Sequence, residues 1–251
     1  MYYSQFGEDK ILAKIFNEKK HGFCIEVGAN DGINDSTTYY FEKLGWECIL
    51  VEPNPVLCKM IRETRNSKLY EFAASDKNDE VTLFVAEGAE RAHGVSTIST
   101  DQESLNKIKS YGFTYNKVQV QTKTLDEILI ESKISSEIDF VSIDVEGHEI
   151  GVLRGFSIER WMPTVVLLED NSNFESAEVR NYLKSYGYVG FMRTGVNDWY
   201  ARKDNKKLVS FSNRSKYNWK LIKVRLKNKI RKIPGIIKFK SWLVRFLVKS
   251  A

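Results

Sequence analysis

Apolar and polar positions follow one another in blocks along most of the chain, and the blocks predict strands and helices in turn. Strands are predicted at residues 23–27, 47–51, 68–74, 80–86, 117–122, 138–145 and 163–170, and an antiparallel pair at 188–192 and 197–202. Helices are predicted at residues 37–44, 55–65, 124–129 and 177–187, whereas residues 87–116 give no clear pattern. Several strands are continuously apolar, which is typical of a parallel sheet with helices on both faces. The sequence therefore predicts an α/β fold.

Charge divides the chain into two parts. Residues 203–251 contain 16 Lys and Arg against one acid, which gives this segment a net charge of +15. The other residues carry 22 bases and 32 acids, a net charge of −10. We therefore expect a folded domain over residues 1–202 and a basic tail over residues 203–251.

The tail combines its basic residues with two apolar stripes. The first has apolar residues at steps of three and four, at Trp219, Ile222, Leu226, Ile230 and Ile233. Pro234-Gly235 interrupts the pattern, and a second stripe follows at Phe239, Trp242, Leu243 and Phe246. Basic amphipathic helices of this kind bind anionic membrane surfaces. The alternative is a pair of helices that pack on the acidic domain or form a homodimer contact. Nucleic acid is not an expected partner, because the domain itself is acidic.

Composition also bears on location. No apolar run is long enough to span a bilayer, and the N-terminus lacks the basic and apolar regions of a secretory signal. The three cysteines, Cys24, Cys48 and Cys58, are odd in number, and two lie in or beside predicted buried strands. Reduced thiols in the core of a cytoplasmic protein are the better interpretation. If the tail binds a membrane, the protein would be peripheral at its inner face.

Glycines follow the first predicted strand, and a carboxylate ends the second. The pattern is Glu26-x-Gly28-x-Asn30-x-Gly32, and Glu52 stands 20 residues after Gly32. Glycine lets the backbone approach a ligand closely, and an acid at the second strand end can accept hydrogen bonds from a ribose diol. G-x-G-x-x-G and G-K-[ST] are absent, so an adenosine ligand without phosphates, such as S-adenosylmethionine, is favoured. The alternative is a tight turn beside a solvated strand end.

A second group of ionisable residues follows the strand predicted at residues 138–145. Asp144, Glu146, His148 and Glu149 lie within six residues of one another. Ionisable groups directly after an apolar strand are costly unless they face a site. This segment is therefore a candidate catalytic loop.

From about Tyr3 to Arg202, the sequence resembles the FkbM family of S-adenosylmethionine-dependent methyltransferases. The matching motifs are SQFGED (4–9), IEVGANDG (25–32), GWECILVEPNP (45–55), AASD (73–76), TLDE (124–127), DVEGHE (144–149) and LLED (167–170). Each motif alone is weak, but seven in order at plausible spacings are a strong signal.

The resemblance implies a Rossmann-like class I methyltransferase fold, whose seven-stranded sheet has six parallel strands and one antiparallel strand. In this scheme the loop at 28–32 lines the methionine part of the cofactor, Glu52 holds the ribose, and Ala74 and Ser75 lie along the adenine. The implied cofactor contacts are Gln5, Glu26, Gly28, Asn30, Gly32, Ser36, Glu52, Pro53, Ala74, Ser75 and Asp144.

The expected reaction is attack by a substrate oxygen on the cofactor methyl group, and the oxygen must lose its proton. In one route, Asp144, Glu146 or His148 is the general base. His148 has the best intrinsic pKa for this work, although it could equally face away at the start of the next helix.

In the other route, a divalent metal lowers the pKa of the hydroxyl. Asp144, Glu169 and Asp170, with Asn171 beside them, look similar to the magnesium site of catechol O-methyltransferases. Oxygen ligands suit Mg²⁺ or Mn²⁺. The alternative is that Asp170 and Asn171 only cap the following helix.

The acceptor is predicted from the region without a clear pattern, which is long enough to cover a substrate. Arg91, His93 and Asn171 are the candidate acceptor contacts, with a solvated surface loop as the alternative for the first two. Relatives of this kind often methylate sugar hydroxyls, so we expect a nucleotide-linked sugar or a polysaccharide precursor. A secondary metabolite methylated on oxygen or nitrogen is the runner-up, and a non-catalytic cofactor-binding scaffold is a further alternative.

Overall fold

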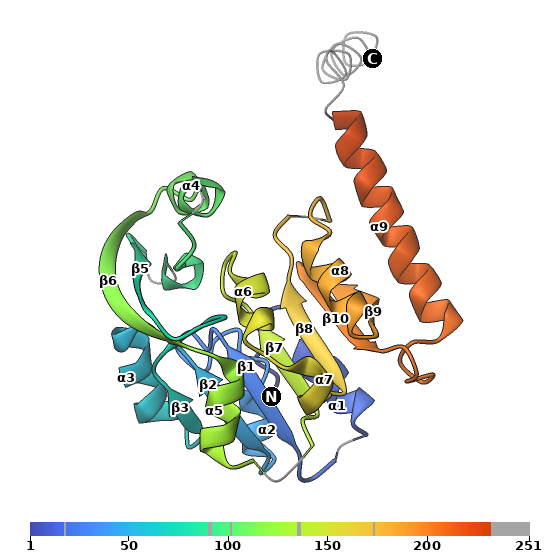
Figure 1. Cartoon of the computed structure of the whole chain (residues 1–251), viewed down its shortest axis with the longest axis horizontal. Coiled ribbons are helices and arrows are strands. Elements are labelled where there is room, and N and C mark those ends of the chain that lie inside the picture. Colours follow the sequence, from blue (N-terminus) through green and yellow to red (C-terminus); the bar gives the residue numbers. More distant parts are fainter. Residues whose placement is uncertain (18, 90–91, 101, 135–136, 173, 232–251) are drawn as a thin grey trace, which may run out of the picture.

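The main sheet has the predicted parallel architecture. The computed structural model describes residues 1–17, 19–89, 92–100, 102–134, 137–172 and 174–231. Seven strands lie in the order β3-β2-β1-β7-β8-β10-β9 (Figure 1). Their bounds are β1 Phe23–Val27, β2 Glu47–Val51, β3 Lys68–Tyr70, β7 Phe140–Ile143, β8 Val165–Glu169, β9 Tyr188–Thr194 and β10 Asn197–Arg202. β10 runs antiparallel to both of its neighbours, so the sheet has six parallel strands and one antiparallel strand.

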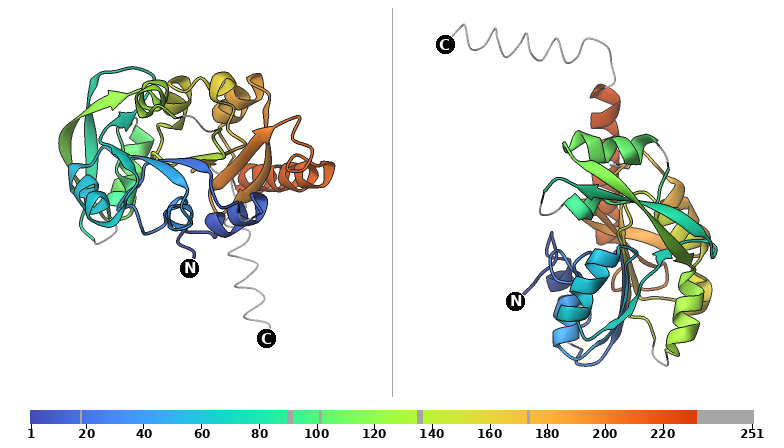
Figure 2. Two further views of the ribbon diagram at one scale, coloured as in Figure 1. Left: turned by 90° about the horizontal axis from the view of Figure 1, so that it is seen from below. Right: turned by 90° about the vertical axis from the view of Figure 1, so that its left-hand side faces the viewer.

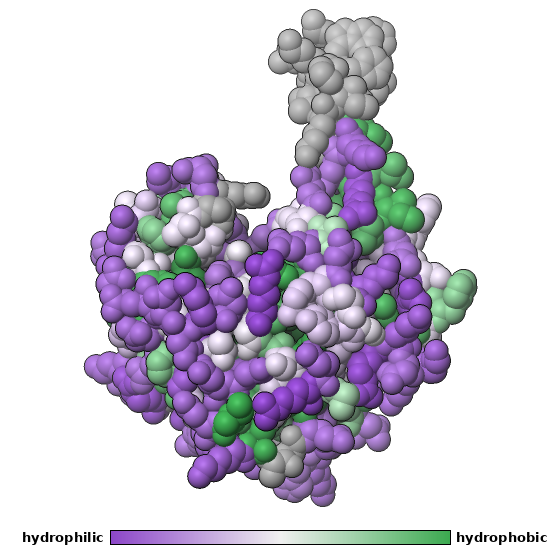
Figure 3. All heavy atoms as spheres, viewed as in Figure 1, coloured by the Kyte–Doolittle hydropathy of each residue, from purple (hydrophilic) through white to green (hydrophobic). Residues whose placement is uncertain are grey.

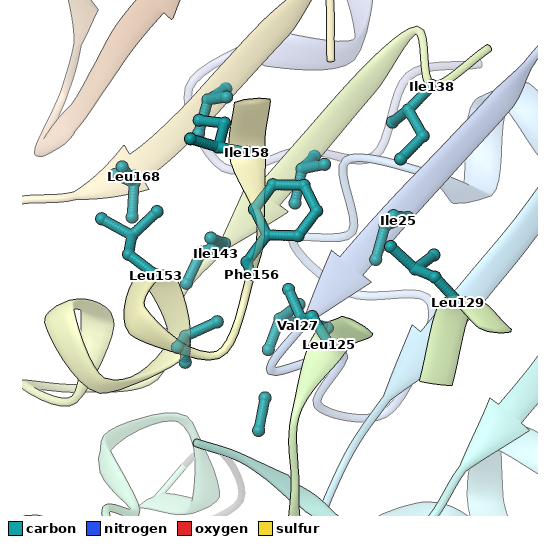
Figure 4. Close-up of a cluster of buried hydrophobic side chains, with 14 of the residues drawn as sticks. Ile25, Val27, Leu125, Leu129, Ile138, Ile143, Leu153, Phe156, Ile158 and Leu168 are labelled. Carbon is teal, nitrogen blue, oxygen red and sulfur yellow. The ribbon is translucent and has the colours of Figure 1, made fainter. Parts of the chain in front are cut away.

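Helices cover both faces of this sheet, which explains the continuously apolar strands. On one face, alternate side chains such as Ile25 and Val141 pack on α5 Leu125–Ser132, α6 Glu149–Arg154, α7 Ile158–Trp161 and α8 Glu178–Ser185 (Figure 4). On the other face, Cys24 and Phe140 pack with α1 Glu8–Ile15 and α2 Tyr39–Lys43. α3 Pro55–Thr64 packs Ile61 on Leu50 of β2. The three cysteines are free and buried, as expected.

The single strand predicted at residues 68–74 is wrong, because the chain leaves the main sheet after Tyr70. β4 Ala73–Ala74 pairs with β6 Thr114–Lys123, which also pairs with β5 Glu80–Glu87, so a second sheet forms in the order β4-β6-β5. The connection from β5 to β6 contains a 3-10 helix, η1 Ala92–Val95, and α4 Gln102–Ser110. Neither of these elements, nor α1, was predicted from the sequence.

The basic tail begins by packing on the domain. Leu208 and Val209 are buried in the same core as α1, and α9 Phe211–Arg231 then packs against β9. Figures 1 and 2 show α9 at one end of the molecule and the second sheet at the other. No helix in the described part of the chain is long and apolar enough to cross a membrane. Pro234-Gly235 and the second apolar stripe lie outside the described residues, and the domain division at 202/203 stays a prediction.

Candidate active site

A pocket lies where the carboxyl ends of β1, β2 and β7 face the second sheet. Strand ends of a parallel sheet are the usual place for a ligand in this kind of fold. The pocket brings together most of the residues predicted for the cofactor and catalysis: Gln5, Glu26, Gly28, Asn30, Ser36, Glu52, Pro53, Ala74, Asp144, Glu146 and His148. Leu83 of β5 and His93 of η1 contribute to the wall on the side of the second sheet.

The two glycines of the predicted loop have different roles. Gly28 has φ +82°, and a Cβ there would lie 1.8 Å from the main-chain oxygen of Asp144. Gly28 therefore cannot carry a side chain, because the ends of β1 and β7 approach each other closely at this edge of the pocket. Gly32 has φ +81°, and a Cβ there would meet Ile61 and Arg65. Gly32 does not line the pocket, so the structure places it in a turn packed on α3 rather than beside a ligand.

Glu52 is buried at the end of β2, with only 6% of its surface exposed. Its Oε2 accepts a hydrogen bond from the main-chain N–H of Asn30 at 3.0 Å, and its Oε1 accepts one from that of Asn54 at 2.9 Å. Burial raises the pKa of Glu52 to about 7, although both N–H donors act in the opposite direction. Each oxygen keeps a lone pair for a further donor. The alternative of a solvated strand end is therefore wrong.

Glu26 uses its carboxylate within the protein. It accepts hydrogen bonds from Ser36 Oγ at 2.7 Å, from the N–H and Oγ1 of Thr37 at 2.6 and 3.0 Å, and from Thr38 Oγ1 at 2.5 Å. Arg65 supports the same loop through Thr38 Oγ1 at 3.1 Å. Glu26 and Ser36 thus shape the pocket wall. The sequence reasoning missed the two threonines, although a run of hydroxyl side chains after the glycine loop was a visible signal.

The N-terminal segment also contributes to the pocket wall. Ser4 forms an isolated bridge with Asp35, which places Gln5 in the pocket wall. Glu8, in α1, also lines the pocket and accepts hydrogen bonds from Thr194 Oγ1 at 2.6 Å and Asn197 Nδ2 at 3.1 Å. The predicted closure of the pocket by Gln5 is consistent with this placement.

His148 lies at the edge of the pocket and contacts Ser75 rather than the cluster of acids. His148 Nε2 lies 3.0 Å from Ser75 Oγ, and Ser75 does not line the pocket. His148 precedes α6, and its ring covers Gly151, where a Cβ would come within 2.2 Å. Burial lowers the pKa of His148, so the ring is neutral at neutral pH.

Three carboxylates converge beside the pocket: Asp144, Glu146 and Glu169 each offer an oxygen within 4.8 Å of the others. Lys107 of α4 forms an ion pair with Glu146, and its Nζ lies 3.9 Å from Glu169 Oε1. Desolvation and then the charges of Glu169 and Glu146 raise the pKa of Asp144 well above its usual value. Burial and the charge of Glu169 raise the pKa of Glu146 to about 7. Lys107 supplies positive charge to this cluster, and the sequence reasoning missed it.

Asp170 does not join the cluster, in contrast to the predicted metal site. Its carboxylate accepts hydrogen bonds from Ser172, from the main-chain N–H of Phe174 at 3.0 Å and from Arg193 Nη1 at 3.2 Å. Asn171 does reach the cluster and donates a hydrogen bond to Glu146 Oε2 at 3.2 Å. The set of converging acids therefore has Glu146 where Asp170 was predicted.

A second cavity of about 670 Å³ lies on the other side of the carboxylates. Its walls come from α4, from the loop after β7, from the end of β8 and from α8. Among the described residues, Glu146 is the one that lines both this cavity and the first pocket. Glu146 also has φ +53°, an unfavourable conformation for a residue with a side chain, and such strain is concentrated at functional sites.

The residues predicted to contact the acceptor are separated in the structure. His93 lines the first pocket, where its Nδ1 is buried without a hydrogen-bond partner among the described residues. Asn171 lines the second cavity. Arg91 lies outside the described residues.

The strand order, the one antiparallel strand and the pocket at the strand ends define a Rossmann-like class I methyltransferase. The family model described as Methyltransferase FkbM domain matches residues 26–189, and the chain belongs to this family. The protein is therefore an S-adenosylmethionine-dependent methyltransferase, which confirms the family and the enzyme class predicted from the sequence.

Individual relatives are distant. Methyltransferase 1 of Beauveria bassiana (strain ARSEF 2860) is 26% identical over 184 residues, which cover 66% of this chain and 72% of that protein. A TehB-like SAM-dependent methyltransferase from Corynebacterium glutamicum ATCC 13032 Kitasato has a TM-score of 0.41 and 9% identity, over 80% of this chain and 89% of the other. Precorrin-6y C5,15-methyltransferase from Geobacter metallireducens GS-15 has a TM-score of 0.39 and 11% identity, over 76% and 84%.

Proposed function

We propose that this methyltransferase transfers a methyl group to a hydroxyl of a sugar that occupies the second cavity. The observation that carries the proposal is the position of Glu146, which lines both the first pocket and the second cavity. A methyl donor and an acceptor that both contact one carboxylate can be brought together for direct in-line transfer, with the carboxylate beside the reacting atoms.

The first pocket fits S-adenosylmethionine. Glu52 would hold the ribose, because both of its oxygens are fixed by main-chain donors and keep capacity for hydroxyl groups. The buried Nδ1 of His93 offers a further polar contact in the pocket wall. When bound, the cofactor supplies a methyl group on a positively charged sulfur, which is a good leaving group.

Glu146 is best placed to accept the proton from the acceptor hydroxyl. Asp144 lies in the same cluster and lines the first pocket, but it does not line the second cavity, where the acceptor would bind. His148 is turned toward Ser75 and does not line the second cavity. Lys107 and Asn171 hold the Glu146 carboxylate through an ion pair and a hydrogen bond. A general base fixed in this way typically contributes a factor of about 10² to 10⁴ in rate.

A divalent metal is the second candidate for activating the hydroxyl. Asp144, Glu146 and Glu169 would hold Mg²⁺ or Mn²⁺, because all three offer oxygen ligands and Glu169 Oε2 is buried without a partner among the described residues. Lys107, however, already brings a positive charge to these carboxylates. We therefore favour the route in which Glu146 acts without a metal.

The second cavity supports a hydroxyl-rich acceptor. Its wall contains the carboxylates of Glu146, Glu149, Glu169, Asp170, Glu178 and Asp198, with Lys107 and Arg180 as its bases. Carboxylates accept hydrogen bonds from hydroxyl groups and repel phosphate. We therefore propose that the sugar enters the cavity, and that any nucleotide or lipid phosphate attached to it stays outside.

Two experiments test this function. Calorimetric titration with S-adenosylhomocysteine should show binding that Glu52→Ala weakens by at least roughly tenfold, about 1.4 kcal/mol. Glu47→Ala, at the exposed start of the same strand, is the matched control and should bind normally. The protein should then transfer a labelled methyl group to members of a panel of free, nucleotide-linked and lipid-linked sugars, detected as a methyl ether by mass spectrometry. Cofactor binding without transfer to any sugar would contradict the acceptor class alone.

A further inference from the structure

α9 has two apolar faces, and one of them packs on the domain. Tyr217, Leu221, Val224 and Asn228 recur at steps of three and four, and they are the less exposed residues of this stretch of the helix. The ring of Tyr217 covers Gly190 of β9 so closely that a Cβ there would lie 2.5 Å from Tyr217 Cε1. The Tyr217 hydroxyl donates a hydrogen bond to Asp198 Oδ2 at 3.0 Å. This face fixes α9 to the domain.

The apolar stripe predicted from the sequence lies on a different face. Its exposed fractions are 58% for Trp219, 46% for Ile222, 53% for Leu226 and 48% for Ile230. In Figure 3 a band of hydrophobic surface runs along α9 beside hydrophilic side chains. If the stripe served to pack the helix on the domain, it would lie where Tyr217 and Leu221 lie. α9 itself packs on the acidic domain, as the alternative expected, but it does so through Tyr217 and Leu221 rather than through this stripe.

We propose that this outer face of α9, formed by Trp219, Ile222, Leu226 and Ile230, binds the surface of an anionic lipid membrane. Residues 211–231 contain eight Lys and Arg and no acid. Lys216, Lys223 and Lys227 are exposed beside the stripe, and Lys223 Nζ lies 5.1 Å from the centre of the Trp219 ring. Lysine stems can extend along the apolar stripe while their charged ends reach anionic headgroups.

Charge also argues against the pairing of this face with the α9 helix of a second copy of the chain. Two α9 helices that met through this face would bring their flanking lysines together without any acid of the same helix to compensate. An anionic bilayer compensates the same charges and buries the same apolar side chains. The site of methyl transfer plays no part in this inference, so it stands or falls independently of the proposed acceptor.

Vesicle flotation with the full chain tests the proposal. The protein should float with phosphatidylcholine vesicles that contain about one third phosphatidylglycerol and remain unbound with pure phosphatidylcholine. Binding should fall as salt is raised, because the interaction is partly electrostatic. Trp219→Glu with Leu226→Glu should reduce the bound fraction by at least roughly tenfold, since both changes place a negative charge in the apolar stripe.

Val56→Glu in α3 is the matched control, because Val56 is an apolar residue that is 60% exposed on another helix. It should bind vesicles like the wild type. Sedimentation equilibrium of the same variants distinguishes the other occupants. A wild-type dimer that Leu226→Glu dissociates, without vesicle binding, would overturn the proposal. Vesicle binding that the double variant leaves unchanged would also overturn it, because residues 232–251 alone would then account for membrane affinity.

Discussion

The first pocket and the second cavity meet at Glu146 but are built in opposite ways. In the pocket, Glu26 has four donors and Glu52 has two main-chain donors, so each buried carboxylate has fixed partners. Where the pocket meets the cavity, the carboxylates of Asp144, Glu146 and Glu169 converge with Lys107 close to them. The difference indicates that one side is rigid and suited to recognition, whereas the other concentrates charge for chemistry.

The largest effect should come from Glu146→Gln. Loss of the proton-accepting carboxylate should lower kcat by about 10²- to 10⁴-fold and leave affinity for S-adenosylhomocysteine within about twofold. Glu149→Gln is the control: Glu149 lines the same cavity but accepts a hydrogen bond from the main-chain N–H of Gly147 at 2.9 Å. Steady-state kinetics and calorimetry on both variants are the measurements. A kcat for Glu146→Gln within a few fold of the wild type would show that another group accepts the proton.

Gly28→Ala should disrupt the backbone that forms the first pocket. The new Cβ would lie 1.8 Å from Asp144 O in a left-handed backbone, so the ends of β1 and β7 must separate. We expect a loss of about 3 kcal/mol in the free energy of unfolding and loss of cofactor binding. Gly45 also has a left-handed backbone, with φ +88°, but a Cβ there would have nothing within 4 Å. Gly45→Ala should therefore lower the free energy of unfolding by only about 1 kcal/mol. Urea denaturation of both variants measures the difference, and equal losses would refute the steric argument.

The rigid side could largely be predicted from the sequence, because its chemistry lies within short segments. Glu52 and Gly28 directly follow apolar strands, and the strand pattern places both at one edge of the sheet. Gly32 shows the limit of this reasoning, since a glycine next to a ligand loop and one packed on α3 look the same in sequence. The prediction of a single strand at 68–74 was wrong because β-strand propensity does not show which sheet a strand joins.

The acceptor side could not be predicted, because it depends on contacts between distant segments. Lys107 belongs to a short polar helix, yet its side chain reaches Glu146, 39 residues further along the chain. Asp170 and Glu169 are adjacent, but one side chain turns to Arg193 and the other to the cluster. Only the tertiary structure decides between such neighbours.

Cofactor binding in the first pocket should depend on pH through Glu52. The raised pKa of Glu52, about 7, means that the free protein holds a proton there in mild acid. Affinity for S-adenosylhomocysteine should therefore rise roughly tenfold between about pH 6 and pH 8, as the carboxylate becomes able to accept from both ribose hydroxyls. Glu52→Gln should bind more weakly, with a flat profile over this range. A wild-type profile that falls as pH rises would contradict the ribose role.

The raised pKa of Glu52 has the opposite effect on folding: the stability of the protein falls as pH rises. The folded state binds the Glu52 proton more tightly than the unfolded chain, whose carboxyl has the ordinary value of 4.5. The contribution of Glu52 to the free energy of unfolding therefore falls as pH rises from 4.5 to about 7, and is constant above that. Urea denaturation of the wild type and Glu52→Gln across this range should show a smaller fall in the variant, where the raised pKa values of Glu146 and Asp144 still contribute.

The smallest effect should come from removal of metal ions. The ammonium group of Lys107 lies against Glu146 and 3.9 Å from Glu169, where it offsets charge that a divalent ion would otherwise neutralise. Exhaustive chelation should therefore change activity by less than about twofold. Lys107→Met removes the ammonium but keeps an unbranched side chain, and should let the three carboxylates bind Mn²⁺, detected by electron paramagnetic resonance. Activity that is lost on chelation and restored by Mg²⁺ would instead establish the metal route, with Lys107 displaced when the ion binds.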